Sequence, residues 1–223
     1  MDKCGVSLMK KLFGMAYLTI LTLTSPVFAE EACHKVPVNW NAESLAKSGV
    51  LCADVLLKSD EEGTRKLRVF ESGNLAFEND DAVLCKTCGG MKGDPFQGLK
   101  WTGKTLAVDN WGGSRETWGE TWKFSKRRLN WLVIGWDRNI TDGLTGSVWT
   151  ESVNAVTHRA TAEYQPGEEA TCEEVSDKTT ECTNGKPKAK KYSCTARIHA
   201  RNIEISQLNQ LREHPFSCGL TTP

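Results

Sequence analysis

The chain of 223 residues carries 28 basic and 28 acidic side chains, so its formal net charge is zero. Binding to nucleic acid rests on many contacts between cationic side chains and phosphates, and a balanced chain therefore argues against that class of function. With 39% hydrophobic and 25% charged residues, the composition fits a folded domain of ordinary size and excludes a disordered chain and a polytopic membrane protein.

The first segment has the layout of a secretory signal peptide. Lys10 and Lys11 precede an apolar stretch over 12–23, and Val27-Phe28-Ala29 forms a small-x-small cleavage site. The apolar stretch is too short to cross a bilayer roughly 30 Å thick as a helix. We therefore expect residues 1–29 to be removed on export, leaving a periplasmic or secreted protein without a membrane span. Because Met9 alone opens a complete signal, translation starts at either Met1 or Met9.

The rest of the chain predicts short antiparallel strands. Residues 41–49 are typical of a short helix that ends at Gly49. The runs 66–71 and 75–79 flank the turn Ser72-Gly73-Asn74 and predict a hairpin. Further strands are expected at 50–57, 82–85, 105–111, 121–125 and 130–137. Because no long amphipathic helices separate these runs, we expect a mainly β fold of antiparallel sheets, either a sandwich or an open barrel-like arrangement.

The composition changes after residue 164. The stretch 164–191 has glycine, proline and many charges but almost no apolar side chains, so it cannot build a core. Residues 192–205 return to a strand pattern, and 206–212 fit one or two helical turns before Pro215. We therefore divide the chain into a signal peptide over 1–29, an antiparallel β domain over 30–164 and a disulfide-tied C-terminal extension over 165–223.

The cysteines support export. Removing residues 1–29 leaves an even number, as expected where thiols are oxidised in pairs. These candidates for disulfides are Cys33, Cys52, Cys85, Cys88, Cys172, Cys182, Cys194 and Cys218. Local spacing favours Cys33 with Cys52 and Cys85 with Cys88, with two further bridges among the last four. Cys85-x-x-Cys88 is also compatible with a redox centre or half a zinc site, but Gly89-Gly90 follows where a redox pair has a helix, so we expect a structural bridge, no metal and no cofactor.

Seven of the eight tryptophans fall between residues 101 and 149. Such rings are either exposed platforms that stack on sugars or large core side chains, and we expect core packing with one or two rings exposed. On a regular strand Trp131 and Trp136, five positions apart, face opposite sides, whereas Trp118 and Trp122 share one side.

The segment from Gly112 to Glu116 joins two predicted strands through a glycine-rich, charged tip. We expect this tip to contact a partner together with its flanking tryptophans. The predicted contact residues are Trp111, Gly112, Gly113, Ser114, Arg115, Glu116 and Trp118. Asp137 to Gly143 resembles a calcium loop, but Asp142 stands one position late, and a turn explains the same residues.

Catalytic motifs are missing from the sequence. It has no Gly-x-Ser-x-Gly and no His-Glu-x-x-His, and none of its four histidines lies in a triad context. We therefore assign no catalytic residues and do not expect an enzyme.

Five segments carry a resemblance to known proteins. They are Leu84-Cys85-Lys86-Thr87-Cys88-Gly89-Gly90, Gly93-Asp94-Pro95-Phe96-Gln97-Gly98-Leu99, Gly113-Ser114 with Trp118, Thr121-Trp122-Lys123-Phe124 and Leu132-Val133-Ile134-Gly135-Trp136-Asp137. Together they resemble a family of exported bacterial proteins with a Gly-Asp-Pro-Phe-x-Gly turn, a Gly-Gly-Ser hairpin and a strand ending in Ile-Gly-x-Asp. The resemblance covers about residues 50–160 and extends to Ser152–Thr157, although His158 replaces the family's glycine. That family has no established activity, so the resemblance implies a periplasmic β-rich domain and no catalytic residues.

These observations predict a soluble periplasmic or secreted binding protein. We expect its partner to be another protein, as for an enzyme inhibitor or an immunity factor against a secreted toxin. The alternative is a glycan-binding module or enzyme of the cell envelope that uses the tryptophan cluster.

Overall fold

The computed structural model describes residues 33–167, 170–176, 179–184, 192–198 and 202–213. The predicted signal peptide over 1–29 lies outside the described residues. None of the helices within these ranges is long and apolar enough to cross a membrane.

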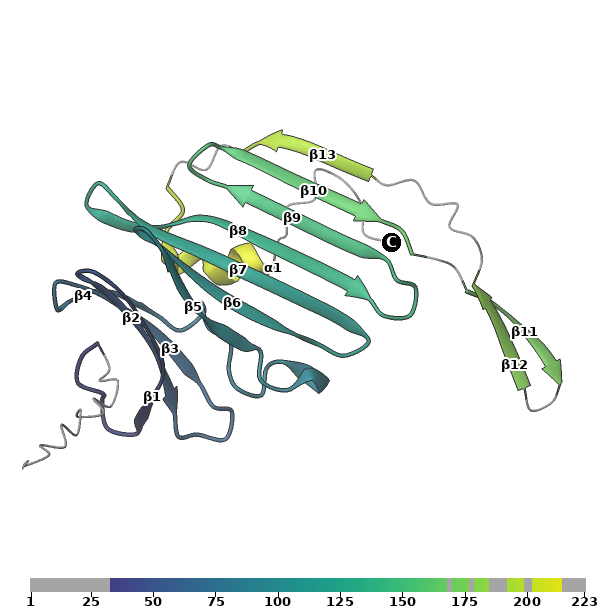
Figure 1. Ribbon diagram of the computed structural model, residues 1–223, viewed down its shortest axis with the longest axis horizontal. Helices are drawn as coiled ribbons and strands as arrows, with labels where there is room; N and C mark the ends of the chain where they lie inside the picture. The colour runs from purple at the N-terminus through teal and green to yellow at the C-terminus, as the bar shows by residue number, and fades with distance from the viewer. Residues whose placement is uncertain (1–32, 168–169, 177–178, 185–191, 199–201, 214–223) are drawn as a thin grey trace, which may run out of the picture.

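Two antiparallel sheets form the body of the molecule (Figure 1), so the expected mainly β fold class is confirmed. The smaller sheet is a four-stranded meander of β1 (Trp40–Ser48), β2 (Leu51–Lys58), β3 (Arg65–Glu71) and β4 (Asn74–Asn79). The larger sheet has seven strands in the order β13-β10-β9-β8-β7-β6-β5. These are β5 (Phe96–Thr102), β6 (Thr105–Gly113), β7 (Glu116–Arg127), β8 (Asn130–Asp142), β9 (Val148–Asn154), β10 (Arg159–Gln165) and β13 (Tyr192–Arg197).

The segment between β10 and β13 forms a separate hairpin of β11 (Ala170–Ser176) and β12 (Thr179–Asn184), which Figure 1 shows projecting away from both sheets. The described residues also include three short helical segments: η1 (Gly90–Lys92), η2 (Ile205–Gln207) and α1 (Leu208–Glu213). The helical turns expected at 206–212 are therefore confirmed.

The core lies between the two sheets. Apolar side chains of β2 and β3, among them Val55 and Leu67, face Val108 on β6 and Phe124 on β7 across the interface. The C-terminal segment returns to this core, because Ile203 and Leu208 are buried in the same cluster. Residues after 164 thus supply one strand of the larger sheet and part of its packing.

The hairpin expected at 66–79 is confirmed and has a two-residue turn. Ser72 and Gly73 both have positive φ, 52° and 79°. Positive φ at both central positions is the hallmark of the type I′ turn, whose twist matches that of the flanking strands.

Two expected elements are wrong. Residues 41–49 form β1 instead of a helix, and β1 pairs with β2 along its whole length. A short stretch gains little from its own helical propensity, so pairing with the buried strand β2 decides its conformation. Residues 82–85 are not a strand: Ala82 and Val83 are buried, but they lie in a connection that the side chain of Asn79 caps by accepting the backbone N–H of Ala82 at 2.7 Å.

The tryptophans mostly pack inside. Trp122, Trp136 and Trp149 are buried, as core packing requires, and Trp118 and Trp122 share a strand face as expected. The expectation that Trp131 and Trp136 face opposite sides is wrong. Val133 lies opposite Phe124 while Gly135 lies opposite Lys123, so Ile134 is an extra residue in β8. This β-bulge shifts the alternation by one position and turns both rings toward the core.

Two of the expected disulfides are present, Cys33–Cys52 and Cys85–Cys88. Cys194 is also disulfide-bonded. The strand register places Cys172 opposite Cys182, and Cys218 lies outside the described residues. The pairing of these last four cysteines stays a prediction.

Candidate binding surface

A row of polar side chains crosses the inner face of the larger sheet. Asn110, Glu120, Arg138 and Glu151 lie directly opposite one another on β6, β7, β8 and β9. We call these four residues the inner charged row. Glu120, Arg138 and Glu151 are buried, which is costly unless the charges are paired and hydrogen-bonded.

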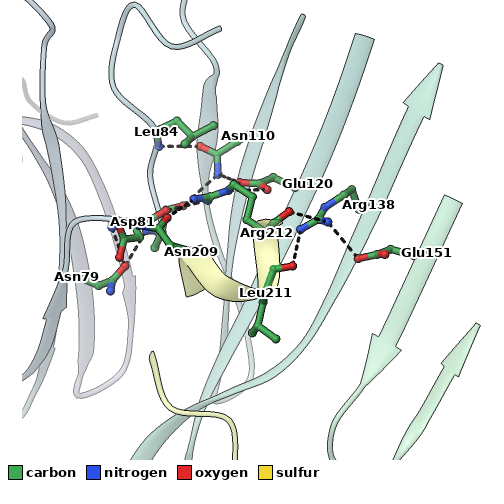
Figure 2. A network of polar contacts seen from close by, with 11 residues as sticks. Asn79, Asp81, Leu84, Asn110, Glu120, Arg138, Glu151, Asn209, Leu211 and Arg212 are labelled. Atoms are coloured by element: carbon green, nitrogen blue, oxygen red, sulfur yellow. Dashed lines mark hydrogen bonds and ion pairs between the residues drawn. The ribbon is translucent and has the colours of Figure 1, made fainter. Parts of the chain in front are cut away.

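Arg212 of α1 supplies the main compensation (Figure 2). Its guanidinium lies 2.7 Å from Glu120 Oε1 and donates to the carbonyl oxygen of Asp81 at 2.8 Å. Asn209, one turn earlier, donates to the Asp81 carboxylate at 2.7 Å. At the other end of the row, Arg138 lies 3.5 Å from Glu151 Oε1. The C-terminal helix thus ties β7 to the loop after β4 and holds the central strands from the inside.

Three loops meet at the end of the larger sheet where β6 finishes and β7 begins (Figure 1). They are the loop 85–95 with η1, the β6–β7 tip over 113–116 and the β8–β9 turn over 142–147, and we call them together the loop end. The backbone N–H of Gly113 donates to Gly89 O at 2.9 Å, and that of Gly143 donates to Arg115 O at 2.9 Å. These two bonds link the three loops into one unit.

Glycine is required where the first two loops touch. A Cβ on Gly112 would lie 2.7 Å from the Trp118 ring and 3.0 Å from Gly89, and one on Gly113 would lie 2.0 Å from Glu116 O. Contacts this short do not occur for real side chains. The two loop backbones can therefore approach each other this closely only because the residues at the contact are glycines. The Cys85–Cys88 bridge, directly before Gly89, closes the loop that makes this contact.

An ion pair fixes the other junction. Arg115 Nη2 lies 3.1 Å from Asp142 Oδ2, while Asp142 Oδ1 accepts the backbone N–H of Leu144 at 2.7 Å. The hydrogen bonds from Arg115 and from the Leu144 N–H lower the pKa of Asp142 to about 2. The carboxylate is therefore ionised at neutral pH and caps the β8–β9 turn. The expected turn over 137–143 is wrong for most of its length, because residues 137–142 form the end of strand β8. Within the described ranges, no group of three or more metal-ligating side chains could hold an ion.

Exposed apolar side chains stand on all three loops or beside them. Met91 on η1 is 89% exposed, Leu144 in the β8–β9 turn is 67% exposed and Trp111 at the end of β6 is 40% exposed. The Lys92 ammonium lies 5.6 Å from the centre of the Trp111 ring, a cation–π contact.

The predicted contact residues do not form one face. Trp111 lies opposite Gly119 and points to the outer side of the larger sheet, whereas Trp118 lies opposite Gly112 on the inner side. Gly112 is buried, while Ser114, Arg115 and Glu116 form the exposed tip. Sequence reasoning missed Met91, Lys92 and Leu144. Met91 and Leu144 each follow a glycine in a turn, and this signal has meaning only once the two turns are known to be neighbours. Lys92 gave no signal of its own.

Comparison with models of protein families finds no match, and the same holds for curated proteins and for solved structures. The surface is therefore interpreted from its geometry.

Proposed function

We propose that this chain is an exported binding protein that recognises another protein through the loop end. The observation that carries the proposal is the joining of three loops by backbone hydrogen bonds, with Met91 and Leu144 exposed on them and Trp111 exposed beside them on β6. Exposed apolar side chains on loops that are held in place are typical of a surface that binds another molecule.

The residue types favour a protein partner. Methionine, tryptophan and arginine are enriched at protein interfaces, and the loop end presents Met91, Trp111 and Arg115 with Glu116 among them. Binding by flexible loops costs ordering entropy. Here the glycine contact, the Cys85–Cys88 bridge and the Arg115–Asp142 ion pair reduce that cost, because the loops are already held in place.

The expected compartment restricts which proteins could be the partner. The leader-like segment 1–29 and the paired cysteines support export, so we place the partner in the periplasm or outside the cell. A hairpin tip that is held in place by two neighbouring loops is suited to a concave surface such as the cleft of an enzyme. We therefore propose an enzyme or toxin of that compartment as the partner, with this chain as its inhibitor or immunity factor.

Site-specific crosslinking tests this proposal. A photo-reactive amino acid is placed at position 91 or 144 in the exported protein, and crosslinked proteins are identified by mass spectrometry. Position 129 is the matched control, because Leu129 is 88% exposed in the β7–β8 turn at the opposite end of the sheet. We expect one partner to crosslink from positions 91 and 144 but not from 129.

The affinity for that partner is then measured with purified variants. Met91→Asp and Leu144→Asp each place a charge in the interface and are expected to raise Kd about tenfold or more, whereas Leu129→Asp leaves it unchanged. Equal crosslinking from all three positions, or a Kd insensitive to both loop-end variants, would refute the proposal.

A further inference from the structure

The outer face of the larger sheet carries a second, separate arrangement of polar residues. On β6 to β9, one row consists of Asp109, Thr121, Asp137 and Ser152, each directly opposite the next. The neighbouring row consists of Trp111, Gly119, Asn139 and Thr150. These eight residues, which we call the outer groove, line a shallow depression of about 450 Å³ together with Gln97 and with the four residues of the inner charged row, which lie between the two rows along the strands.

Gly119 shapes the middle of the groove. It is the only position of the eight without a side chain, and it lies between Trp111 on β6 and Asn139 on β8. A Cβ there would lie 2.6 Å from Asn139 Oδ1 and 3.5 Å from the Trp111 ring. The floor of the groove is thus backbone, with the Trp111 ring on one side and the Asn139 amide on the other.

The first row is fixed by hydrogen bonds. The Thr121 hydroxyl donates to Asp109 Oδ1 at 2.6 Å and the Ser152 hydroxyl donates to Asp137 Oδ1 at 2.6 Å, while Lys123 pairs with Asp137 Oδ2. Each carboxylate retains further acceptor capacity. In contrast, the side chains of Asn139 and Thr150 make no hydrogen bond to any described residue and are directed to the outer side. The groove therefore has a preset row of acceptors beside a row with unused donors and acceptors.

We propose that the outer groove binds a short oligosaccharide. A sugar ring combines an apolar face, which stacks on an aromatic ring, with hydroxyl groups that both donate and accept hydrogen bonds. The outer groove has the same combination: Trp111 is its only apolar side chain, and carboxylates, hydroxyls and an amide make up the rest. Strands are spaced about 4.8 Å apart, so the polar rows extend roughly 14 Å from β6 to β9, long enough for more than one ring.

Other ligands fit this composition less well. A lipid or an apolar peptide would cover the carboxylates and hydroxyls of the groove without offering them hydrogen bonds, which is unfavourable. A nucleic acid meets the carboxylates of Asp109 and Asp137 across the middle of the groove, and these repel phosphate. This site differs from the tryptophan cluster considered from the sequence, because most of those rings are in the core and only Trp111 takes part.

Titration of the intact protein with soluble glycans tests this inference. The probes are oligomers of N-acetylglucosamine and of glucose, followed by calorimetry and by backbone amide NMR shifts. We expect saturable binding of at least one probe, with shifts concentrated at Gly119, Thr121, Asn139 and Thr150. Trp111→Ala is expected to raise Kd about tenfold and Asn139→Ala about fivefold, and Trp111→Phe, which keeps an aromatic face, is expected to restore part of the affinity.

Three control variants show whether an effect is specific to the outer groove. Thr161→Ala alters the same outer face on β10 but lies outside the outer groove, so its Kd is expected to match that of the unmodified chain. Met91→Asp and Leu144→Asp, which disable the loop end, are expected to leave glycan binding intact, so the two proposals fail independently. The inference is overturned if neither probe class binds, or if binding is unaffected by Trp111→Ala and Asn139→Ala.

Discussion

The guanidinium of Arg65 on β3 lies 2.5 Å from the carboxylate of Asp94, in the turn that leads into β5. Arg65 is fully buried and also binds Glu43 at 2.6 Å and the carbonyl oxygen of Leu84 at 3.0 Å. Burial alone would lower the pKa of Arg65, but the hydrogen bonds to Glu43 and Asp94 outweigh it and raise the pKa instead. One side chain therefore joins the four-stranded sheet to the loop end.

Replacing Arg65 is expected to destabilise the fold. Arg65→Met leaves the carboxylates of Glu43 and Asp94 beside an apolar side chain, and we expect the free energy of unfolding to fall by about 3 kcal/mol. This is the lower end of the usual range, since both carboxylates are partly exposed. Urea unfolding measures the change, with Arg159→Met on the exposed face of β10 as the control, expected within about 0.5 kcal/mol of the unmodified chain. A loss below about 1 kcal/mol for Arg65→Met would argue against the bridging role.

The ion pair between Arg115 and Asp142 predicts a pH dependence. Asp142 has a pKa of about 2 in the folded chain, below the value of about 3.9 for an unfolded aspartate. The stabilisation it provides is therefore complete above about pH 4 and is lost as the pH falls from about 4 toward 2. An NMR titration of the Asp142 carboxyl carbon measures the midpoint. Arg115→Gln should raise the midpoint while leaving it below 3.9, because the backbone N–H of Leu144 still donates; a midpoint already near 3.9 in the unmodified chain would contradict the geometry.

The two described disulfides should contribute unequally to stability. The Cys33–Cys52 bridge spans 19 residues and the Cys85–Cys88 bridge spans three. Loop-closure entropy then predicts a cost of about 3 kcal/mol for Cys33→Ser with Cys52→Ser, against about 1.6 kcal/mol for Cys85→Ser with Cys88→Ser. Denaturant unfolding of the two double variants compares them directly. If the Cys85→Ser, Cys88→Ser variant lost more stability than the other one, the Cys85–Cys88 bridge would stabilise the loop 85–95 by more than its effect on chain entropy.

The β3–β4 turn offers a stabilising substitution. Ser72 has positive φ, which asparagine tolerates better than serine, and Asn-Gly is the preferred type I′ pair. Ser72→Asn is expected to raise the free energy of unfolding by about 0.5 kcal/mol, and Ser72→Val, with a β-branched side chain at positive φ, to lower it by about 1 kcal/mol. Thermal unfolding ranks the two variants, and equal midpoints would count against the assigned turn.

Local patterns predicted the parts of the fold that local physics decides. The Ser72-Gly73 turn, the alternation around it and the two short-range disulfides are each set by residues close together in the sequence. The strand at 40–48 was not predictable, because its conformation comes from pairing with β2. The inner charged row could not be predicted for a related reason, because Arg212, which pairs with Glu120, lies far along the chain. In the candidate site, the exposed ring of Trp111 and the charged tip were predictable, whereas Met91 and Leu144 depend on which turns become neighbours.

The extra residue at Ile134 divides β8 into two stretches in which the alternation of inward and outward side chains is shifted by one position. Before it, odd-numbered positions such as Trp131 and Val133 face the core; after it, even-numbered positions such as Trp136 and Arg138 do so. Deletion of this single residue would remove the bulge and leave Trp131 and Trp136 four positions apart, so both rings would still face the core. An alignment that places no gap at this position against a strand without the bulge would therefore misassign every inward residue on one side of it.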